Sequence, residues 1–303
     1  MFKKKQKSLL EINKISPRVD IIFKLVFGIV IGMTCVYPLL MIVGSSFTEN
    51  TILITDGYNV VPRIFSNAAY EFVLSSSSNL LNSYGVTLIV TFIGTITGVT
   101  MMAMYAYAIS RKDLKYRKFF SFFAYVTFVF NGGLVPFYFV YSRLLNLSNT
   151  LAVLIIPYLV NVWYIVILRT FFATSIPDEV IESAKIDGAG EIRTFIQIVM
   201  PLAIPALASV TLFTVLAYWN DFQLGLYFIE DSDKFTVQYL LYRIMGNMEF
   251  IQSNTQSARI TGPLPVEAAR MAMCVLGAGP LLLAYPFFQQ YFIKGLTMGA
   301  IKG

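Results

Sequence analysis

Long apolar runs alternate with shorter polar segments along the whole chain, and this alternation predicts its main elements. Six runs of about 20 mostly apolar residues are centred near residues 33, 97, 130, 161, 214 and 283. A helix of that length crosses the hydrocarbon core of a bilayer and satisfies its own backbone polar groups there. The pattern therefore predicts an all-α integral membrane protein with six transmembrane helices.

The polar segments between these runs read as loops and not as separate domains. Residues 1–20 precede the first run, longer polar segments cover 48–80 and 229–270, and residues 175–200 separate the fourth run from the fifth. The sequence has no internal repeat, low-complexity tract or interdomain linker. We therefore predict a single transmembrane domain over residues 1–303.

The distribution of Lys and Arg predicts the orientation in the membrane. Of the 23 Lys and Arg, 17 fall on the side that holds both termini and residues 175–200, and six fall on the other side. Cytoplasmic loops are enriched in Lys and Arg. We therefore expect cytoplasmic termini, a cytoplasmic segment at 175–200, and external loops at 48–80 and 229–270. The basic run at 111–118 is interpreted as an inner loop that anchors this topology.

Composition agrees with a membrane protein and excludes several other classes. The chain is 56% hydrophobic and only 13% charged. A soluble domain would contain fewer hydrophobic and more charged residues. Basic loops beside membrane helices account for the net charge of +6, so no nucleic-acid partner is expected. There is no histidine, no phosphate-binding Gly-x-x-x-x-Gly-Lys-[Ser/Thr] loop and no metal-ligand cluster. We expect no catalytic residue, metal or cofactor in this chain, which cannot hydrolyse ATP by itself.

The segment Ser175–Pro201 is unlike the apolar runs on either side of it. Ser175 can cap a first helix, because Ser side chains accept hydrogen bonds from free N–H groups at a helix start. A glycine-rich turn at 187–190 ends that helix, and a second amphipathic helix then leads into the fifth span. Ala184 and Gly188 are spaced to share one face, where small side chains would allow another surface to approach closely.

Small and polar residues mark particular places inside the second, third and fourth spans. Gly85, Gly94 and Gly98 give the second span a surface suited to close helix packing, and Asn82-Ser83 resembles a cap at its start. Asn131-Gly132-Gly133, with a proline three residues later, predicts a break in the third span. The freed backbone groups face either a cavity, with Asn131 on a solute path, or packed protein. Asn149-Thr150 is expected to open the fourth span.

The fifth span, from about Leu202 to Phe228, carries Trp219, Asn220 and Asp221 in its outer part. An acidic group at that depth must face the bundle interior, a partner or the outer interface. In one interpretation the three residues line a solute path, with Asn220 and Asp221 offering hydrogen bonds to polyols and Trp219 an aromatic face. In the other, Asp221 pairs with a basic group and Trp219 is an interfacial anchor. Both stay open from the sequence.

One motif in the polar segment resembles a known family. Glu182-Ser183-Ala184, three residues, Gly188, nine residues, and then Ile198-x-Met200-Pro201 resemble the "EAA" loop of ABC-importer permeases. Ser183 and Met200 replace the Ala and Leu of the family pattern. The resemblance implies that the 176–188 helix is a coupling helix that docks on a separate ATPase, with Glu182, Ser183, Ala184 and Gly188 as its contact residues.

Further motifs look like the carbohydrate branch of these permeases. They are Asn82-Ser83, Gly132 to Pro136, Asn149-Thr150, Trp219 to Asp221, and the ending from Tyr291 to Gly303. The resemblance implies the type I importer fold in the bacterial cytoplasmic membrane. It also implies a heterodimer with a second homologous permease, two ATPase subunits that hold ATP and Mg, and an extracellular or periplasmic solute-binding protein that delivers an oligosaccharide.

Two other classes remain as alternatives. A secondary transporter would be expected to show ionisable residues near the bilayer midplane and inverted repeats, and neither is clear here. A membrane scaffold or channel would not need the cytoplasmic helix-turn-helix that exposes Glu182. A permease for a solute other than a sugar also stays open.

Overall fold

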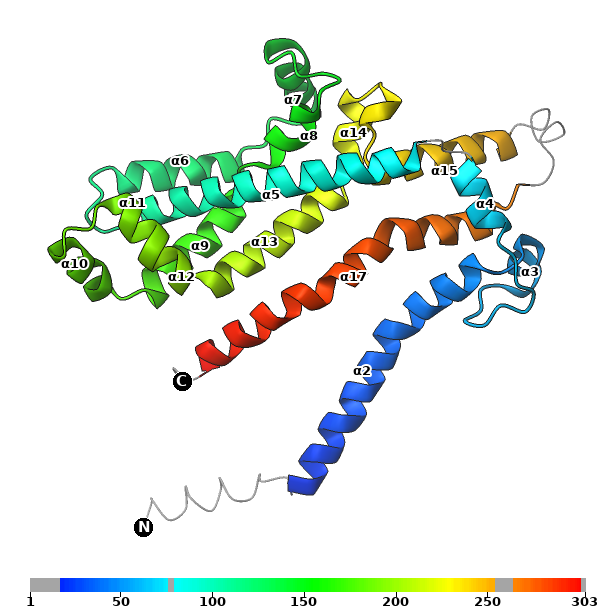
Figure 1. Cartoon of the computed structure of the whole chain (residues 1–303), viewed down its shortest axis with the longest axis horizontal. Coiled ribbons are helices and arrows are strands. Elements are labelled where there is room, and N and C mark those ends of the chain that lie inside the picture. Colours follow the sequence, from blue (N-terminus) through cyan, green and yellow to red (C-terminus); the bar gives the residue numbers. More distant parts are fainter. Residues whose placement is uncertain (1–16, 76–78, 254–263, 301–303) are drawn as a thin grey trace. The chain divides into compact units, whose positions relative to one another are not determined.

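The computed structural model describes residues 17–75, 79–253 and 264–300, which are mostly helical (Figure 1). Within these ranges the extended pairing is limited to one bridge between Thr48 and Phe65. The all-α prediction is therefore confirmed. The chain divides into two compact units, one of residues 1–75 and 255–276 and one of residues 76–254 and 277–303. The prediction of one transmembrane domain stays a prediction.

The first unit contains α2 (Pro17–Ser46), α3 (Asn50–Asp56), α4 (Ala68–Ser75) and the start of α17 (Val266–Ala300). Its small core joins one buried residue of α3 and one of α4 to Ala268 and Ala272 of α17. By contrast, every side chain of α2 from Lys24 to Leu40 is exposed within the chain. A long apolar helix with this exposure needs lipid or another protein around it.

The second unit contains the remaining helices. In chain order they are α5 (Leu80–Ser110), α6 (Arg117–Val129), α7 (Leu134–Phe139), the π-helix η1 (Val140–Leu144), α8 (Leu151–Ile155), the 3₁₀ turn η2 (Ile156–Tyr158), α9 (Val162–Ser175), α10 (Asp178–Ile186), α11 (Glu191–Thr194), the π-helix η3 (Phe195–Val199), α12 (Met200–Leu202), α13 (Ile204–Trp219), α14 (Gln223–Phe228), the 3₁₀ turn η4 (Ser232–Lys234) and α15 (Val237–Ser253).

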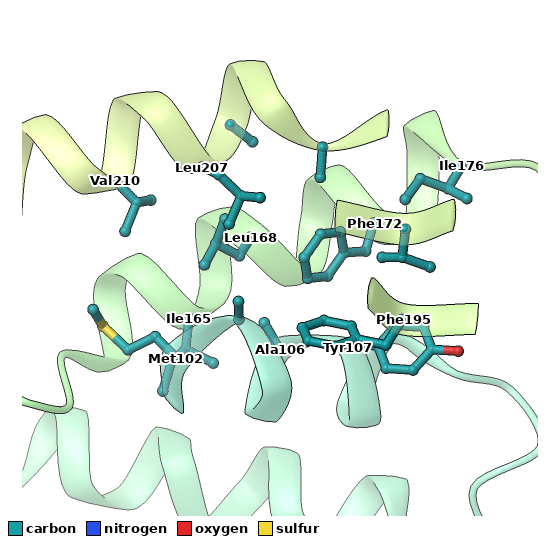
Figure 2. Packing of buried hydrophobic residues seen from close by; sticks show 14 of the residues in the cluster. Met102, Ala106, Tyr107, Ile165, Leu168, Phe172, Ile176, Phe195, Leu207 and Val210 are labelled. Atoms are coloured by element: carbon teal, nitrogen blue, oxygen red, sulfur yellow. The ribbon is translucent and has the colours of Figure 1, made fainter. Parts of the chain in front are cut away.

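α5 is the central element of this unit, and α9 and α13 pack along it (Figure 1). Figure 2 shows the buried cluster between these helices, with Met102 and Ala106 from α5 facing Leu168 of α9 and Val210 of α13. Tyr107 stacks at a tilt on Phe195, with their ring centroids 5.2 Å apart. This cluster joins the end of α5 to the beginning of the predicted fifth span.

Two of the three glycines predicted to allow close packing of α5 do have a neighbouring segment close to them. A Cβ at Gly94 would overlap the ring of Tyr218, and a Cβ at Gly98 would lie 3.1 Å from the carbonyl oxygen of Leu159. Gly85 has open space in front of its Cα. The close approach of α13 and of the η2 segment to α5 therefore depends on Gly94 and Gly98.

The helices that are long and apolar enough to cross a membrane cover Lys24–Ser46, Leu80–Ser110 and Val266–Pro286 in the described residues. Three bent pairs also pass the same test: 117–144, bent by 111°, 151–175, bent by 46°, and 191–219, bent by 84°. Together these elements allow up to six crossings, the predicted count, if each bent pair crosses once. The break expected at Asn131 to Pro136 is present, between α6 and α7, and Gly133 there has a φ of +82°.

Three predicted boundaries differ from the structure. α5 starts at Leu80, so Asn82-Ser83 lies in its first turn and does not cap it, and the Asn82 amide instead donates to the Asp233 carbonyl at 2.7 Å. Ser175 ends α9 and does not cap α10, because Pro177 disfavours helical backbone at Ile176, which is extended and separates the two helices. The span expected from Leu202 to Phe228 is interrupted after Trp219. Thr150 directly precedes α8, so a helix begins where the fourth span was expected to start.

Candidate functional site

The glycine turn after α10 has a defined hydrogen-bond geometry. Gly188 donates its N–H to the Lys185 carbonyl at 3.0 Å, and Ala189 donates to the Ala184 carbonyl at 2.9 Å. These two bonds form a Schellman motif, in which the residue after the C-cap adopts a left-handed conformation. Gly188 has a φ of +79°, which glycine adopts without a Cβ clash. The turn thus ends α10 at a defined residue, Ile186, and changes the direction of the chain before α11.

α10 has one face against its own chain and one face in solvent. Ile181 and Ala184 are buried, and Ile181 belongs to the same cluster as Tyr107 and Phe195. Glu182 and Ser183 are exposed, and Ser183 donates its hydroxyl to the Val180 carbonyl at 3.0 Å. The small side chain of Ala184 therefore lets α10 lie close to its own chain. The surface that α10 offers to a partner consists of the residues around Glu182 and Ser183.

An exposed apolar side chain adds to that surface. Ile186, in the last turn of α10, is 86% exposed. The motif comparison did not select it, because the family pattern leaves that position unspecified. It is apolar, whereas the other exposed residues of α10 are polar, and this contrast is the signal that could have identified it.

Ion pairs join α10 to the inner loop that follows α5. The Lys112 Nζ lies 2.7 Å from Asp178 at the start of α10, and the Lys185 Nζ lies 2.8 Å from Asp113 at its end. Lys185 also lies 2.9 Å from Glu191 of α11. The inner loop was interpreted only as a topological anchor, and sequence reasoning missed these pairs.

The charges in this network stabilise one another. Hydrogen bonds from Lys185 and Arg111 lower the pKa of Asp113 to about 2, because they stabilise its carboxylate. Hydrogen bonds to Asp113 and Glu191 raise the pKa of Lys185. Asp113 and Lys185 therefore both stay charged at neutral pH.

An apolar cavity adjoins the network. It has a volume of about 660 Å³ and is lined by Met104, Leu114, Ile192, Phe195 and Met200, among others. The Tyr107 hydroxyl donates to a Glu191 carboxylate oxygen at 3.0 Å on its border. Ile192 is 77% exposed. The cavity therefore lies between the end of α5 and the helix that follows the glycine turn.

Two of the predicted solute-path residues are engaged inside the chain. Trp219 is 5% exposed, and its Nε1 donates to the Gly277 carbonyl at 2.9 Å. Asp221 is 8% exposed and accepts from the Tyr158 hydroxyl at 2.9 Å and from the Leu224 N–H at 3.2 Å. In the described part of the chain no basic group pairs with Asp221. Within those residues a tyrosine hydroxyl and a backbone N–H take the place of the basic group that the alternative interpretation expects.

The other two predicted path residues are exposed and lie at breaks between helices. Asn220 follows the last residue of α13, and its side chain is exposed. Asn131 is exposed between α6 and α7, and its Oδ1 accepts from the Gly133 N–H at 2.8 Å. The structure does not bring Asn131 and Asn220 into contact with each other. Their contact with a solute stays a prediction.

Comparisons with known proteins agree over most of the chain. Residues 117–298 match the family described as binding-protein-dependent transport system inner membrane component. The chain is 33% identical to the polygalacturonan/rhamnogalacturonan transport system permease protein YtcP of Bacillus subtilis, over 91% of this chain and 96% of that protein. It is 29% identical to the trehalose/maltose transport system permease protein MalG of Thermococcus litoralis, over 93% of this chain and 97% of that protein.

A solved structure shares the fold. It is a chain in the crystal structure of a bacterial ABC transporter involved in the import of the acidic polysaccharide alginate. The TM-score is 0.76 and the sequence identity is 27%, and the match covers 92% of this chain and 100% of that chain. At this coverage the similarity extends into both units.

Proposed function

The chain belongs to the family of binding-protein-dependent transport system inner membrane components, and from that membership we propose that it is the permease subunit of an ATP-driven carbohydrate importer. The family consists of transport components, so the chain is a membrane transport subunit and not an enzyme. In the proposal it forms half of the translocation path, and a second homologous permease forms the other half. Two separate ATPase subunits bind ATP and Mg.

The observation that carries the coupling part of the proposal is the exposed face of α10. A short helix with Glu182, Ser183 and Ile186 in solvent follows an apolar helix and ends in a Schellman turn. The Schellman turn holds the C-terminal end of α10 in one conformation. The exposed face of α10 can therefore act as a rigid docking surface. We propose that α10, which lies within the expected 176–188 helix, docks on the ATPase. Closure of the ATPase dimer would then move the spans.

The substrate class is proposed from the relatives. The proteins named above transport polygalacturonan or rhamnogalacturonan, trehalose or maltose, and alginate. All of these are carbohydrates, so an oligosaccharide or polysaccharide fragment is the proposed solute. An extracellular or periplasmic solute-binding protein would deliver it. The proposed location is the bacterial cytoplasmic membrane, with six spans and both termini in the cytoplasm.

The test begins with purification of the tagged chain from native membranes. We expect a second permease and an ATPase to co-purify with it. Vesicles that contain this complex, ATP inside and the solute-binding protein outside should take up a labelled oligosaccharide and not a labelled amino acid. A proton ionophore should leave that uptake unchanged.

Two results would overturn the proposal. One is uptake by the chain alone without any ATPase. The other is uptake that depends on an ion gradient and not on ATP, which would support the secondary-transporter alternative.

A further inference from the structure

The inner loop, residues 111–116, contacts both ends of α10. Lys112 pairs with Asp178 in the first turn of α10, and the next residue, Asp113, pairs with Lys185 in its last turn. Two consecutive residues of one loop thus bind the two ends of one helix. The pairs join segments that lie 66 and 72 positions apart in the sequence.

The inner loop is itself firmly attached to α5. The Arg111 guanidinium donates to both oxygens of Asp113, at 3.2 and 2.9 Å, and the Arg111 N–H donates to the Ala108 carbonyl of α5. A two-point Arg–carboxylate contact restricts both partners in orientation as well as distance. Asp113 is therefore held in position relative to α5 when it binds Lys185.

Lys185 is the centre of the contact because it reaches two elements. Its side chain is 39% exposed and lies between Asp113 of the inner loop and Glu191 of α11, whereas the Lys112 side chain is 78% exposed. Ion pairs between more exposed groups contribute less, since water and salt screen them. Removal of Lys185 should therefore loosen α10 more than removal of Lys112.

We propose that the inner loop, through the Asp113–Lys185 pair, transmits displacement of α10 directly to α5, so that Lys185 is a positioning residue for coupling. This inference rests on the proposed function, in which α10 docks on the ATPase. The covalent connections of α10 lead to α9 and α11, and Ile181 packs in the buried cluster that includes Tyr107 of α5. The inner loop adds a polar connection to α5, the helix at the centre of the second unit. The loop precedes residue 117, where the family match begins.

The test compares charge removal inside and outside this contact, in the purified complex with its ATPase. Lys185→Met removes both ion pairs of the lysine at similar length, and Asp113→Asn removes the carboxylate charge at constant shape. Lys118→Met is the matched control, because Lys118 is exposed and pairs with no acidic group in the described ranges. Lys185→Arg keeps the positive charge. The measured quantity is the amount of oligosaccharide taken up per ATP hydrolysed.

We expect Lys185→Met and Asp113→Asn to lower this ratio about two- to fivefold, the range that partly exposed ion pairs allow. Lys185→Arg and Lys118→Met should stay near the wild-type ratio. The double variant should be no worse than Lys185→Met, because both changes remove the same contact. A purely structural role would lower the yield of complex without changing the ratio.

The inference and the proposed function fail in different ways. Absence of the ATPase from the wild-type complex would refute the proposed function. An ATPase that co-purifies normally, together with an unchanged ratio in both single variants, would refute only the role of the inner loop. Fully additive losses in the double variant would also refute it, because the two residues would then act separately.

Discussion

Gly188 combines a left-handed backbone with open space, and this separates two possible effects of replacing it. Its φ is +79°, and a Cβ built there would meet no atom of the chain within 4 Å. A β-branched residue at positive φ is strained by its own backbone. Any harm from Gly188→Val therefore comes from strain in the Schellman turn, or from a partner, and not from a clash within the chain.

We predict that Gly188→Val lowers both ATPase co-purification and solute-stimulated ATP hydrolysis. The left-handed conformation costs a non-glycine residue about 1–2 kcal/mol, so the turn shifts and α10 is no longer aimed correctly. Gly190→Val is the matched control, because Gly190 has a φ of −72° and equally open surroundings. Normal coupling in Gly188→Val would show that the turn does not position a docking surface. Glu182→Ala should lower coupling less than Gly188→Val does. The change removes only an exposed ion pair between Glu182 and a basic group of the ATPase, and such a pair contributes about 1 kcal/mol or less.

Residue-scale features were predictable from the sequence where they depend on local backbone chemistry. The glycine turn at 187–190 and the break near Gly133 are of this kind, because glycine permits conformations that other residues disfavour. The burial of Ala184 was not predictable, because helical spacing does not say which face meets the rest of the chain. Nor was the pair between Asp113 and Lys185, which joins charges from two distant segments.

At the scale of the elements, the break between α13 and α14 gives Asn220 and Asp221 different roles. Asp221 is buried, holds the Tyr158 hydroxyl and accepts from the Leu224 N–H at the start of α14. Asn220 is exposed beside it. The sequence placed both residues in one continuous span, because the apolar run extends across the break and hydropathy does not report where a helix ends.

We predict that Asn220→Ala lowers oligosaccharide uptake and leaves the assembled complex intact. Asp221→Ala should instead lower the free energy of unfolding of the complex by about 1–3 kcal/mol, because it leaves the half-buried Tyr158 hydroxyl and a backbone N–H without their acceptor. Uptake and the melting temperature of the purified complex measure the two effects. Unchanged uptake in Asn220→Ala would exclude it from the solute path, and an unchanged melting temperature in Asp221→Ala would contradict the role described for its carboxylate.

The bends inside the spans show what periodicity leaves undetermined. The sequence indicated a break near Asn131 but not that α6 and the helix after it differ in direction by 111°. Hydropathy reports how deeply a segment prefers to be buried and carries no information about its direction. The three bend angles therefore could not be predicted from the sequence.

For the whole molecule, the distribution of basic residues predicts which surfaces face the cytoplasm. With Cys35 and Cys274 replaced by Ala, a cysteine introduced by Lys115→Cys should react with a membrane-impermeant maleimide only when the cytoplasmic side is accessible. A cysteine introduced by Arg63→Cys should react from outside intact cells, since both positions are exposed in the chain. The cause is the enrichment of Lys and Arg on the inner side. The reverse labelling pattern would show that the topology is opposite to the predicted one.

The 84° bend at Ala203 has a mechanical consequence. The helical stretch Glu191–Leu202 is about 18 Å long at about 1.5 Å per residue, and it stands nearly at a right angle to α13. If α13 crosses the bilayer, this stretch lies along the membrane surface as a lever arm. A sideways push at Glu191, perpendicular to both helices, then exerts a torque about the long axis of α13. The spans would respond to an approaching subunit by turning as well as by tilting.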